Sequence, residues 1–325
     1  MKNQDKIRIE ERILALMESS NLAPWKCPWM FSNANYGFGN DTPYRGVNAV
    51  MTAMYRASMG FKSVRWFTNT KISNLNGMFW DEAKGKFVKD KSGTYETFYH
   101  IRKGARSIPV IKVNIFAKTD KSTGLPLQDE DGNPVVIPTF RVYNVFNGDD
   151  VVGYDPGASE KETETIGTSP VSIESAVQFQ KDILARYEGH PSVDNLGGDR
   201  AYYIPSLDEV HLPDVKQFTS WQEYASTLAH ELSHSTGHER RLKRDMTGSF
   251  GTRAYSKEEL VAEFSAAMIL ARYGVEEIPV ENSAAYIKSW ASKIRQEQGI
   301  LYEAIQMAQR SCDLIMGTAA AEVKA

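Results

Sequence analysis

The sequence predicts an α+β protein built from two domains. Apolar residues recur at helical spacing near both ends of the chain, whereas residues 63–147 contain short runs rich in β-branched and aromatic residues. Residues 156–170 are rich in Gly, Ser, Thr and acidic residues, which is the composition of a linker. With 325 residues, the chain is long enough for two hydrophobic cores. We therefore expect an N-terminal domain at 1–155 and a C-terminal domain at 171–325.

The N-terminal half is predicted to be mixed α/β. Residues 5–18 place apolar side chains on one helix face, and residues 45–60 form a second helical segment that ends at Gly60. Strands are predicted at residues 63–69, 107–118 and 139–147. The polar residues between the last two strands predict a long hairpin loop.

The C-terminal half is predicted to be mainly helical. Helical spacing marks residues 172–187, 219–238, 256–274 and 283–316. Two short strands, joined by a turn at residues 206–209, precede the second of these helices. We expect Thr219 or Ser220 to cap that helix and Ser256 to cap the next, because these hydroxyls accept the free N–H groups of a first turn.

Charge is distributed unevenly along the chain. Residues 1–157 hold 21 Lys and Arg against 16 Asp and Glu, and the remainder holds 17 against 25. The basic surplus is concentrated in residues 21–112, where the count is 14 against 5. A basic half joined to an acidic half suggests an anionic partner for the first half only.

Cysteine content and hydropathy predict a cytoplasmic protein. Two cysteines are too few for the disulfide framework of a small secreted protein. The charged N-terminus lacks the apolar run of a signal peptide, and no stretch approaches the roughly 20 apolar residues of a membrane span. We therefore expect no membrane partner.

The stretch HELSH, residues 230–234, predicts a metal-dependent hydrolase site. His230 and His234 are four residues apart, so on a helix they share a face and can bind one ion. Glu231 would hold a metal-bound water and act as the general base. We expect Zn²⁺, and another divalent ion such as Mn²⁺ or Co²⁺ would also suit these donors.

A catalytic zinc site needs a third protein ligand, and the next predicted helix offers two carboxylates. The stretch from Glu259 to Glu263, ELVAE, resembles the glutamate-zincin pattern ExxxD, with Glu in place of the usual Asp. The resemblance implies that Glu259 binds zinc and that Glu263 hydrogen-bonds a zinc histidine. An alternative stays open, because Ser256 and Glu259 also match a capping box. If Glu259 caps the helix, Glu263 becomes the ligand.

Other residues near the motif have weaker claims. His238 would lie about 12 Å along a continuous helix from His230, which is too far for one ion. Tyr255 or Tyr286 could stabilise an oxyanion, although packing is the commoner role for such residues. One of the short strands before the active helix could pair with an extended peptide.

The basic half interleaves aromatic and cationic residues, which is the mixture that single-stranded nucleic acid requires. Cations neutralise phosphates, and aromatic rings stack on unpaired bases. An ordinary hydrophobic core with a solvated basic face would account for the same composition. The residues proposed to bind single-stranded DNA are Trp25, Trp29, Arg45, Trp66, Lys71, Arg102 and Lys103.

Several stretches, taken in order, resemble the ArdC type of plasmid antirestriction protein over nearly the whole chain. They are APWKCPW, TPYRGVNAVM, IRKGARSIPVI, FRVYNVFN, AYYIPSLDEVHLP, HELSHSTGH and SKEELVAEFSAAMILARYG. The front half is also similar to the N-terminal region of plasmid conjugative primases. The residues after Asn76 look longer than the usual link to the IRKGARS stretch.

The resemblance implies an N-terminal domain that binds single-stranded DNA and a C-terminal zincin-like metallopeptidase domain. It implies a role in protecting incoming plasmid or other mobile DNA from host restriction during transfer. A protein substrate, such as a component of the restriction system, is expected. The alternative is a protein that coats single-stranded DNA and whose metallopeptidase-like domain is structural or regulatory, so that proteolysis is dispensable.

Overall fold

The computed structural model of the chain forms two compact units. Unit 1 comprises Met1–Lys6, Tyr36–Asp41 and Lys62–Glu160, and unit 2 comprises Ile7–Asn35, Thr42–Phe61 and Lys161–Ala325. The residues that the structure describes are 3–20, 23–27, 34–40, 42–76, 78–81, 86–89, 99–120, 122–129, 132–155, 173–196, 198–248, 252–275 and 284–318. The expected linker therefore lies outside the described residues.

Unit 1 is built on a four-stranded sheet with the order β1-β2-β7-β6. The strands are β1 (Tyr36–Gly37), β2 (Arg65–Phe67), β6 (Ile108–Ala117) and β7 (Val136–Asn147). β1 is parallel to β2, whereas the β2–β7 and β6–β7 pairs are antiparallel. Two small ladders accompany this sheet: β3 (Met78–Asp81) pairs with β4 (Lys86–Lys89), and β5 (His100–Ile101) pairs with β8 (Val151–Val152).

The core of unit 1 is small and lies at one end of this sheet. Phe67, the last residue of β2, is fully buried with residues of helix α4 (Asn69–Leu75) and of the β5–β8 ladder. Stacking of Phe38 on Phe67, with 4.3 Å between ring centroids, extends the cluster. The short 3-10 turn η2 (Gly148–Asp150) then carries the chain from β7 into β8.

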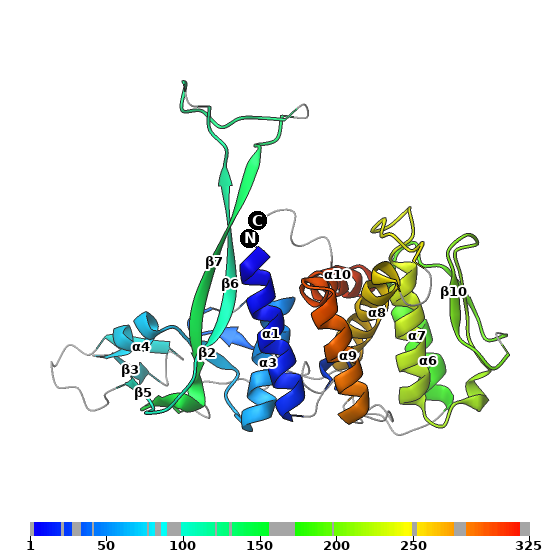
Figure 1. The fold of residues 1–325 in the computed structure, drawn as a ribbon, viewed down its shortest axis with the longest axis horizontal. Helices are drawn as coiled ribbons and strands as arrows, with labels where there is room; N and C mark the ends of the chain where they lie inside the picture. Colours follow the sequence, from blue (N-terminus) through cyan, green and yellow to red (C-terminus); the bar gives the residue numbers. More distant parts are fainter. Residues whose placement is uncertain are drawn as a thin grey trace. The chain divides into compact units, whose positions relative to one another are not determined.

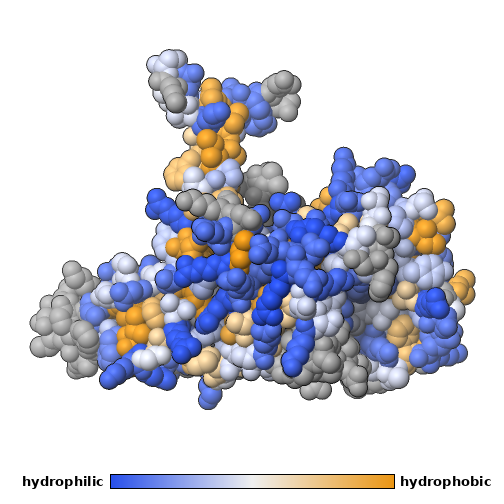
Figure 2. All heavy atoms as spheres, viewed as in Figure 1, coloured by the Kyte–Doolittle hydropathy of each residue, from blue (hydrophilic) through white to orange (hydrophobic). Residues whose placement is uncertain are grey.

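Strands β6 and β7 form a ribbon that projects from this core (Figure 1). Their register pairs Ile108 with Val145 near the core and Ala117 with Val136 at the far end. Ile108, Val110, Ile111 and Val145 near the core are buried, whereas hydrophobic side chains from Val113 outward along β6 are exposed (Figure 2). Solvent therefore reaches both faces of the outer ribbon within unit 1.

Unit 2 is a group of packed helices with one small sheet. Its helices are α1 (Asn3–Ser20, from Ile7 onward), α3 (Val47–Met59), α6 (Ile173–Arg186), α7 (Trp221–Ser235), α8 (Arg253–Arg272), α9 (Ala284–Gln296) and α10 (Ile300–Ile315). The 3-10 turns η1 (Pro24–Lys26) and η3 (Val215–Gln217) complete it. α8 packs against both α7 and α10, and its residues Ala262, Ala266 and Ala267 are buried. Small side chains let these helices approach closely.

The small sheet of unit 2 has the order β10-β11-β9. Its strands are β9 (Ser192–Asp194), β10 (Tyr202–Ile204) and β11 (Glu209–His211). β10 and β11 are the two strands expected around the turn at 206–209, and they pair in antiparallel register. β10 lies at the edge of this sheet and contacts α7.

The two units do not follow the predicted division at residues 155 and 171. Segments from the front of the sequence belong to unit 2 because specific bonds connect them to the C-terminal helices. Buried Glu10 of α1 accepts hydrogen bonds from the backbone N–H groups of Gly299 and Leu301, and thereby caps α10. Arg45 forms an ion pair with Asp313 of the same helix.

Two predicted helix boundaries were wrong. The helix expected to start at Ser256 starts three residues earlier, because Thr252 is its cap and accepts the N–H of Tyr255. Ser256 instead donates its hydroxyl to the carbonyl of Thr252 inside the first turn. The final helix is broken into α9 and α10 at Gly299, whose positive φ of 86° ends a continuous helix.

In the portion of the chain that the structure describes, every helix is too short or too polar to cross a bilayer.

Candidate metal centre

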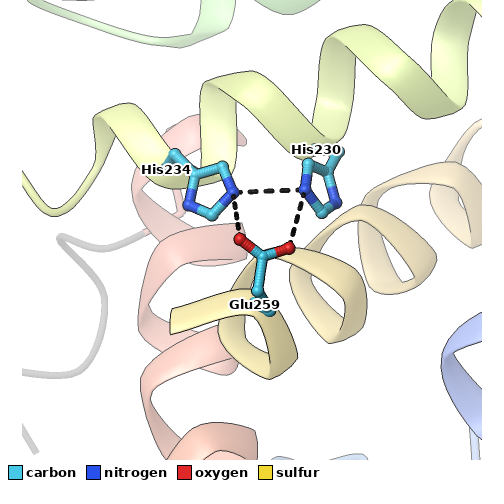
Figure 3. A group of neighbouring side chains, drawn as sticks. All are labelled: His230, His234 and Glu259. Carbon is cyan, nitrogen blue, oxygen red and sulfur yellow. Dashed lines mark hydrogen bonds and ion pairs between the residues drawn. The ribbon is translucent and has the colours of Figure 1, made fainter. Parts of the chain in front are cut away.

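Helix α7 presents the two histidines of HELSH on one face. The Ser220 hydroxyl caps this helix by accepting the N–H of Glu223 at 3.1 Å, which confirms one of the two expected caps. Leu228 and Leu232 are fully buried on another face of the helix, and their burial fixes how the helix is rotated about its axis. His230 and His234, one turn apart, then point together toward α8 (Figure 3).

Glu259 on α8 completes a group of three donors. Its two carboxylate oxygens each lie 3.7 Å from one histidine Nε2, one from His230 and the other from His234. The two Nε2 atoms are 3.1 Å apart, and all three donor atoms lie within 4.8 Å of one another (Figure 3). Since Thr252 caps α8, Glu259 is not needed at the helix start, and the capping-box alternative no longer competes for it.

The donor chemistry of this group fits a divalent cation. His234 Nδ1 lies 3.2 Å from a carboxylate oxygen of Glu258, so a proton on Nδ1 leaves the Nε2 lone pair facing His230 and Glu259. With both Nε2 atoms unprotonated, two imidazole nitrogens and a carboxylate oxygen would converge on one ion. This is the two-histidine, one-glutamate set that catalytic zinc sites use, with a further position left for water or substrate.

Glu258 and Arg244 form a clamp behind His234. Arg244 donates Nε to one oxygen of Glu258 at 2.8 Å and Nη2 to the other at 2.6 Å. The same guanidinium donates Nη1 to the Thr236 hydroxyl and Nη2 to the carbonyl of Ser233. Both charged side chains are about nine-tenths buried, so this clamp fixes the His234 ring in a low-dielectric environment.

The charges around the histidines shift their pKa values in opposite directions. Burial lowers the pKa of His230, and the neighbouring His234 and Lys26 lower it further. Burial would also lower the pKa of His234, but its hydrogen bond to Glu258 and the nearby carboxylates raise that pKa above its ordinary value. Although burial would raise the pKa of Glu258, Arg244 and His234 lower it, so Glu258 is ionised at neutral pH.

Glu231 faces the cleft beside the three donors. The cleft has a volume of about 490 Å³, and its walls come from β10, α7, the 245–248 loop and α8. Glu231 is only 8% exposed, and burial raises the pKa of its carboxyl to about 7. Tyr203 in β10 hydrogen-bonds Glu231 through its backbone, and Tyr255 also lines the cleft and hydrogen-bonds Glu259.

Glu263 does not have the position that the zincin resemblance implied. The carboxylate at His234 belongs to Glu258, whereas Glu263 lies one turn beyond Glu259 and binds Lys26. The distances from Lys26 Nζ to the two oxygens of Glu263 are 2.8 and 2.9 Å. His238, the weaker candidate, accepts the N–H of Arg240 through its Nδ1 and stays outside the donor group.

The aromatic residues proposed for DNA binding are not shown together on one surface. Trp66 is 1% exposed, so this prediction was wrong: the ring is part of the packed interior and is not available to a base. Trp29 lies outside the described residues, and only the backbone of Trp25, in η1, is described. The strand pattern RWF did not reveal that both rings are buried, because three residues are too few to establish alternation.

The basic residues proposed for DNA binding fall into both units. Arg45 is engaged in the ion pair with Asp313 in unit 2, and its side chain is 32% exposed. Lys71, Arg102 and Lys103 are exposed in unit 1. Arg102 also donates a hydrogen bond to the carbonyl of Asp149, and the Arg102 side chain is still 59% exposed.

The sequence did not reveal three residues that build the site. Glu258 precedes the proposed ligand and was overlooked because the ExxxD pattern directed attention to position 263. Arg244 follows the motif by ten residues, and only tertiary structure brings it to Glu258. Lys26 precedes Glu263 by 237 residues, and its place in a basic, aromatic stretch suggested DNA instead.

Comparison with known proteins defines the class of the two parts. Residues 189–307 match the family model described as a zincin-like metallopeptidase, which covers α7 and α8 with all three donors. Residues 3–146 match the family model described as the N-terminal domain of anti-restriction factor ArdC. The chain therefore combines an ArdC-type N-terminal domain with a zincin-like domain, and the resemblance found in the sequence is confirmed at the level of these two domains.

Solved structures agree over nearly the whole length. Two crystal structures of the antirestriction protein ArdC from plasmid R388 are similar to this chain, one metal-free and one Mn(II)-bound. The metal-free structure has a TM-score of 0.63 at 27% identity, with 97% of each chain covered. The Mn(II)-bound structure has a TM-score of 0.65 at 28% identity, with 99% of each chain covered. The two-domain α+β fold is thus confirmed.

Curated relatives include longer proteins. A DNA primase TraC from Escherichia coli is 28% identical over 324 residues, which is 95% of this chain and 27% of that protein. Protein y4eC from Sinorhizobium fredii is 28% identical over 314 residues, or 94% of this chain and 89% of that protein. The chain therefore spans about a quarter of the length of the matched primase.

Proposed function

We propose that this protein protects incoming plasmid or other mobile DNA from host restriction, with single-stranded DNA bound by unit 1 and a metal-dependent peptidase site in unit 2. The observation that carries the peptidase part is the convergence of His230, His234 and Glu259 in a cleft that also contains Glu231. The Mn(II)-bound structure of an ArdC relative supports a divalent ion at this kind of site. We propose Zn²⁺ as the ion, with Mn²⁺ or Co²⁺ able to replace it.

The ion would supply Lewis-acid chemistry and would lower the pKa of a bound water. The side chains of this protein supply the proton transfers. Glu231 is the proposed general base, because its raised pKa of about 7 matches proton transfer near neutral pH. The Tyr255 hydroxyl lies in the same cleft, where it could donate a hydrogen bond to developing negative charge on a peptide carbonyl.

Edge strand β10 gives a peptide a place to bind. It is the outer strand of its sheet, and its residues Tyr202 and Tyr203 line the cleft beside the donors. An extended peptide could add to this edge through backbone hydrogen bonds, with its scissile bond near Glu231. We propose a protein substrate, such as a restriction component, in accordance with this geometry.

The Glu231→Gln variant tests the peptidase proposal. The carboxamide keeps the shape of the side chain but cannot accept a proton, so we expect bound zinc to remain and cleavage of a quenched-fluorescent peptide library to fall by about 10²-fold to 10⁴-fold. Cleavage at the wild-type rate by this variant would contradict the assignment. Protection of incoming DNA that survives in Glu231→Gln would support the alternative in which the protein coats DNA.

The ribbon of β6 and β7 supports DNA binding by unit 1. Its register places Lys112 directly opposite Arg141, and both side chains are exposed. Like charges facing each other across a ladder are unfavourable without a counter-charge, and neither strand contains Asp or Glu. A phosphate backbone would supply that counter-charge. Tyr143, next on the same face and 37% exposed, offers a ring to an unpaired base.

A second exposed basic feature of unit 1 lies around the turn at Gly39. The Arg65 guanidinium lies over the ring of Tyr36, 4.8 Å from the centroid, and donates to the carbonyl of Asn40. The Lys71 ammonium lies beside Gly39, whose φ of 73° produces the turn. With Arg102 and Lys103, these cations are our proposed DNA contacts in unit 1.

Salt dependence of oligonucleotide binding tests the DNA proposal. Each phosphate contact to a single strand contributes about 0.7 to the slope of log K against log salt. The Lys112→Ala/Arg141→Ala variant should therefore bind a single-stranded oligonucleotide more weakly and with a slope smaller by about 1.4. Lys216→Ala/Lys243→Ala, which removes two cations of unit 2, is the matched control. An unchanged slope in the ribbon variant would exclude the ribbon, and equal affinity for duplex and single strands would contradict the single-strand preference.

A further inference from the structure

The ion pair between Lys26 and Glu263 joins the front of the sequence to the helix that carries the proposed metal ligand Glu259. One ammonium binds both carboxylate oxygens, at 2.8 and 2.9 Å. The two side chains are 15% and 19% exposed, so both charges are largely removed from water. Removal of either partner would leave the other charge poorly solvated.

Lys26 is held in place by its own segment. Its neighbours Ala23 and Cys27 are almost fully buried, at 0% and 3% exposed, and η1 packs against α8. Backbone hydrogen bonds from Lys26 to Ala23 and from Cys27 to Pro24 close the 3-10 turn. The backbone under Lys26 is therefore fixed, and its side chain needs little further ordering to reach Glu263.

Glu263 is chemically suited to be a fourth ligand. It follows Glu259 by four residues, so the two carboxylates lie on one face of α8, about 6 Å apart along the helix axis. Its charge interacts with both Glu259 and His234. A site closed by four protein ligands is typical of structural zinc, whereas a catalytic site keeps one position open. In this structure both carboxylate oxygens of Glu263 bind Lys26 instead.

We propose that Lys26 is a positioning residue that holds Glu263 out of the coordination sphere and thereby keeps a coordination position open for water and substrate. The inference rests on the metal site of the proposed function. It also gives a role in unit 2 to Lys26, a residue of the basic, aromatic stretch. The Lys26 ammonium supplies to Glu263 the positive charge that the metal would otherwise supply. Loss of that ammonium leaves the metal as the nearest alternative cation.

The Lys26→Met variant, titrated with Mn²⁺ alone, tests this role. Met keeps the length of the side chain without its charge, so Glu263 should move to the metal. We expect Mn²⁺ to bind more tightly by about tenfold or more. Changes next to metal ligands typically alter metal affinity on a 10-fold to 100-fold scale. Water-proton relaxation by the bound ion should fall, because one fewer water remains on it. If Lys26 only stabilised the fold, Lys26→Met would weaken Mn²⁺ binding and leave the number of waters on the ion unchanged.

Two further variants separate this role from a packing defect. In Lys26→Met/Glu263→Gln the competing carboxylate is absent, so Mn²⁺ affinity and relaxation should return to the wild-type values. Lys26→Arg retains the positive charge and should resemble the wild type. Wild-type affinity and relaxation in Lys26→Met would overturn the proposal, as would a double variant that keeps the changes of the single one.

Metal binding by the wild-type protein tests the proposed function separately from the role of Lys26. If wild-type protein binds no Mn²⁺ or Zn²⁺, the proposed function fails before the variants are compared. If the wild type binds the ion and Lys26→Met is indistinguishable from it, only the role of Lys26 fails.

Discussion

His234 Nδ1 and a carboxylate oxygen of Glu258 lie 3.2 Å apart, and this contact fixes which nitrogen of His234 faces the proposed metal. Glu258 is itself bound by Arg244 through both of its oxygens. Arg244 continues to the Thr236 hydroxyl, which donates to Ser311 on α10. The orientation of one proposed ligand therefore depends on bonds that reach three helices.

Weakening of this contact should lower metal affinity. In Glu258→Gln, a neutral amide replaces the carboxylate that stabilises a proton on His234 Nδ1, so we expect Zn²⁺ affinity to fall by about 10-fold to 100-fold. Competition with a chromophoric chelator measures this change. Glu223→Gln alters a carboxylate at the far end of α7 and should retain wild-type affinity. Unchanged affinity in Glu258→Gln would show that this carboxylate does not tune His234.

The two carboxylates of α8 should respond differently to truncation. Glu259→Ala removes one of three donors, so we expect the purified variant to lose its bound zinc. Glu263→Ala removes the partner of Lys26 and should keep the metal, because the donor group of His230, His234 and Glu259 is intact. Elemental analysis of both purified variants gives the answer. Loss of metal only in Glu263→Ala would exchange the two assignments.

The raised pKa of Glu231 predicts a specific pH dependence of stability for metal-free protein. The carboxyl has an ordinary pKa of 4.5 and a folded-state pKa of about 7. Between these pH values the folded state holds a proton that the unfolded state has released, so the contribution of Glu231 to the free energy of unfolding falls as pH rises. The full loss is roughly 3 kcal/mol, at about 1.4 kcal/mol for each factor of ten in proton affinity.

Denaturant unfolding of the metal-free protein between pH 4.5 and 7 measures this loss. Glu231→Gln has no proton to release, so its stability should fall less steeply over this range than that of the wild type. Parallel curves for the two proteins would mean that Glu231 titrates near its ordinary pKa in the folded state.

Arg45 should affect stability rather than DNA binding. Its partner Asp313 is 7% exposed, and Arg272 also lies 3.6 Å from that carboxylate. Arg45→Ala therefore leaves a buried charge only partly compensated, and we expect a loss of about 1 to 2 kcal/mol in the free energy of unfolding. Oligonucleotide affinity should stay at the wild-type value. A large drop in affinity with unchanged stability would return Arg45 to the DNA surface.

The sequence predicted much of the fold because its strongest signals are local. Helix α7 and its cap at Ser220 follow from spacing and from a hydroxyl at the right position. The strands β6 and β7 follow from enrichment in β-branched and aromatic residues. The start of α8 was misplaced because two hydroxyl residues, Thr252 and Ser256, each precede a helical pattern, and only the backbone shows which one is the cap.

The site was predictable only where its residues share one motif. His230, Glu231 and His234 are contiguous, and helix geometry alone places them together. The partners Glu258, Arg244 and Lys26 depend on how α7, α8 and η1 pack. The same limit explains the error at Trp66, since a tryptophan beside an arginine has the same local sequence whether its ring is buried or exposed.

Anomalous scattering from crystals of the Zn²⁺-loaded protein tests the central claim most directly. The predicted result is one strong zinc peak about 2.0 to 2.2 Å from His230 Nε2, His234 Nε2 and an oxygen of Glu259, with Glu263 still bound to Lys26. A peak coordinated by Glu263 in place of Glu259, or the absence of zinc between the two histidines, would contradict the account.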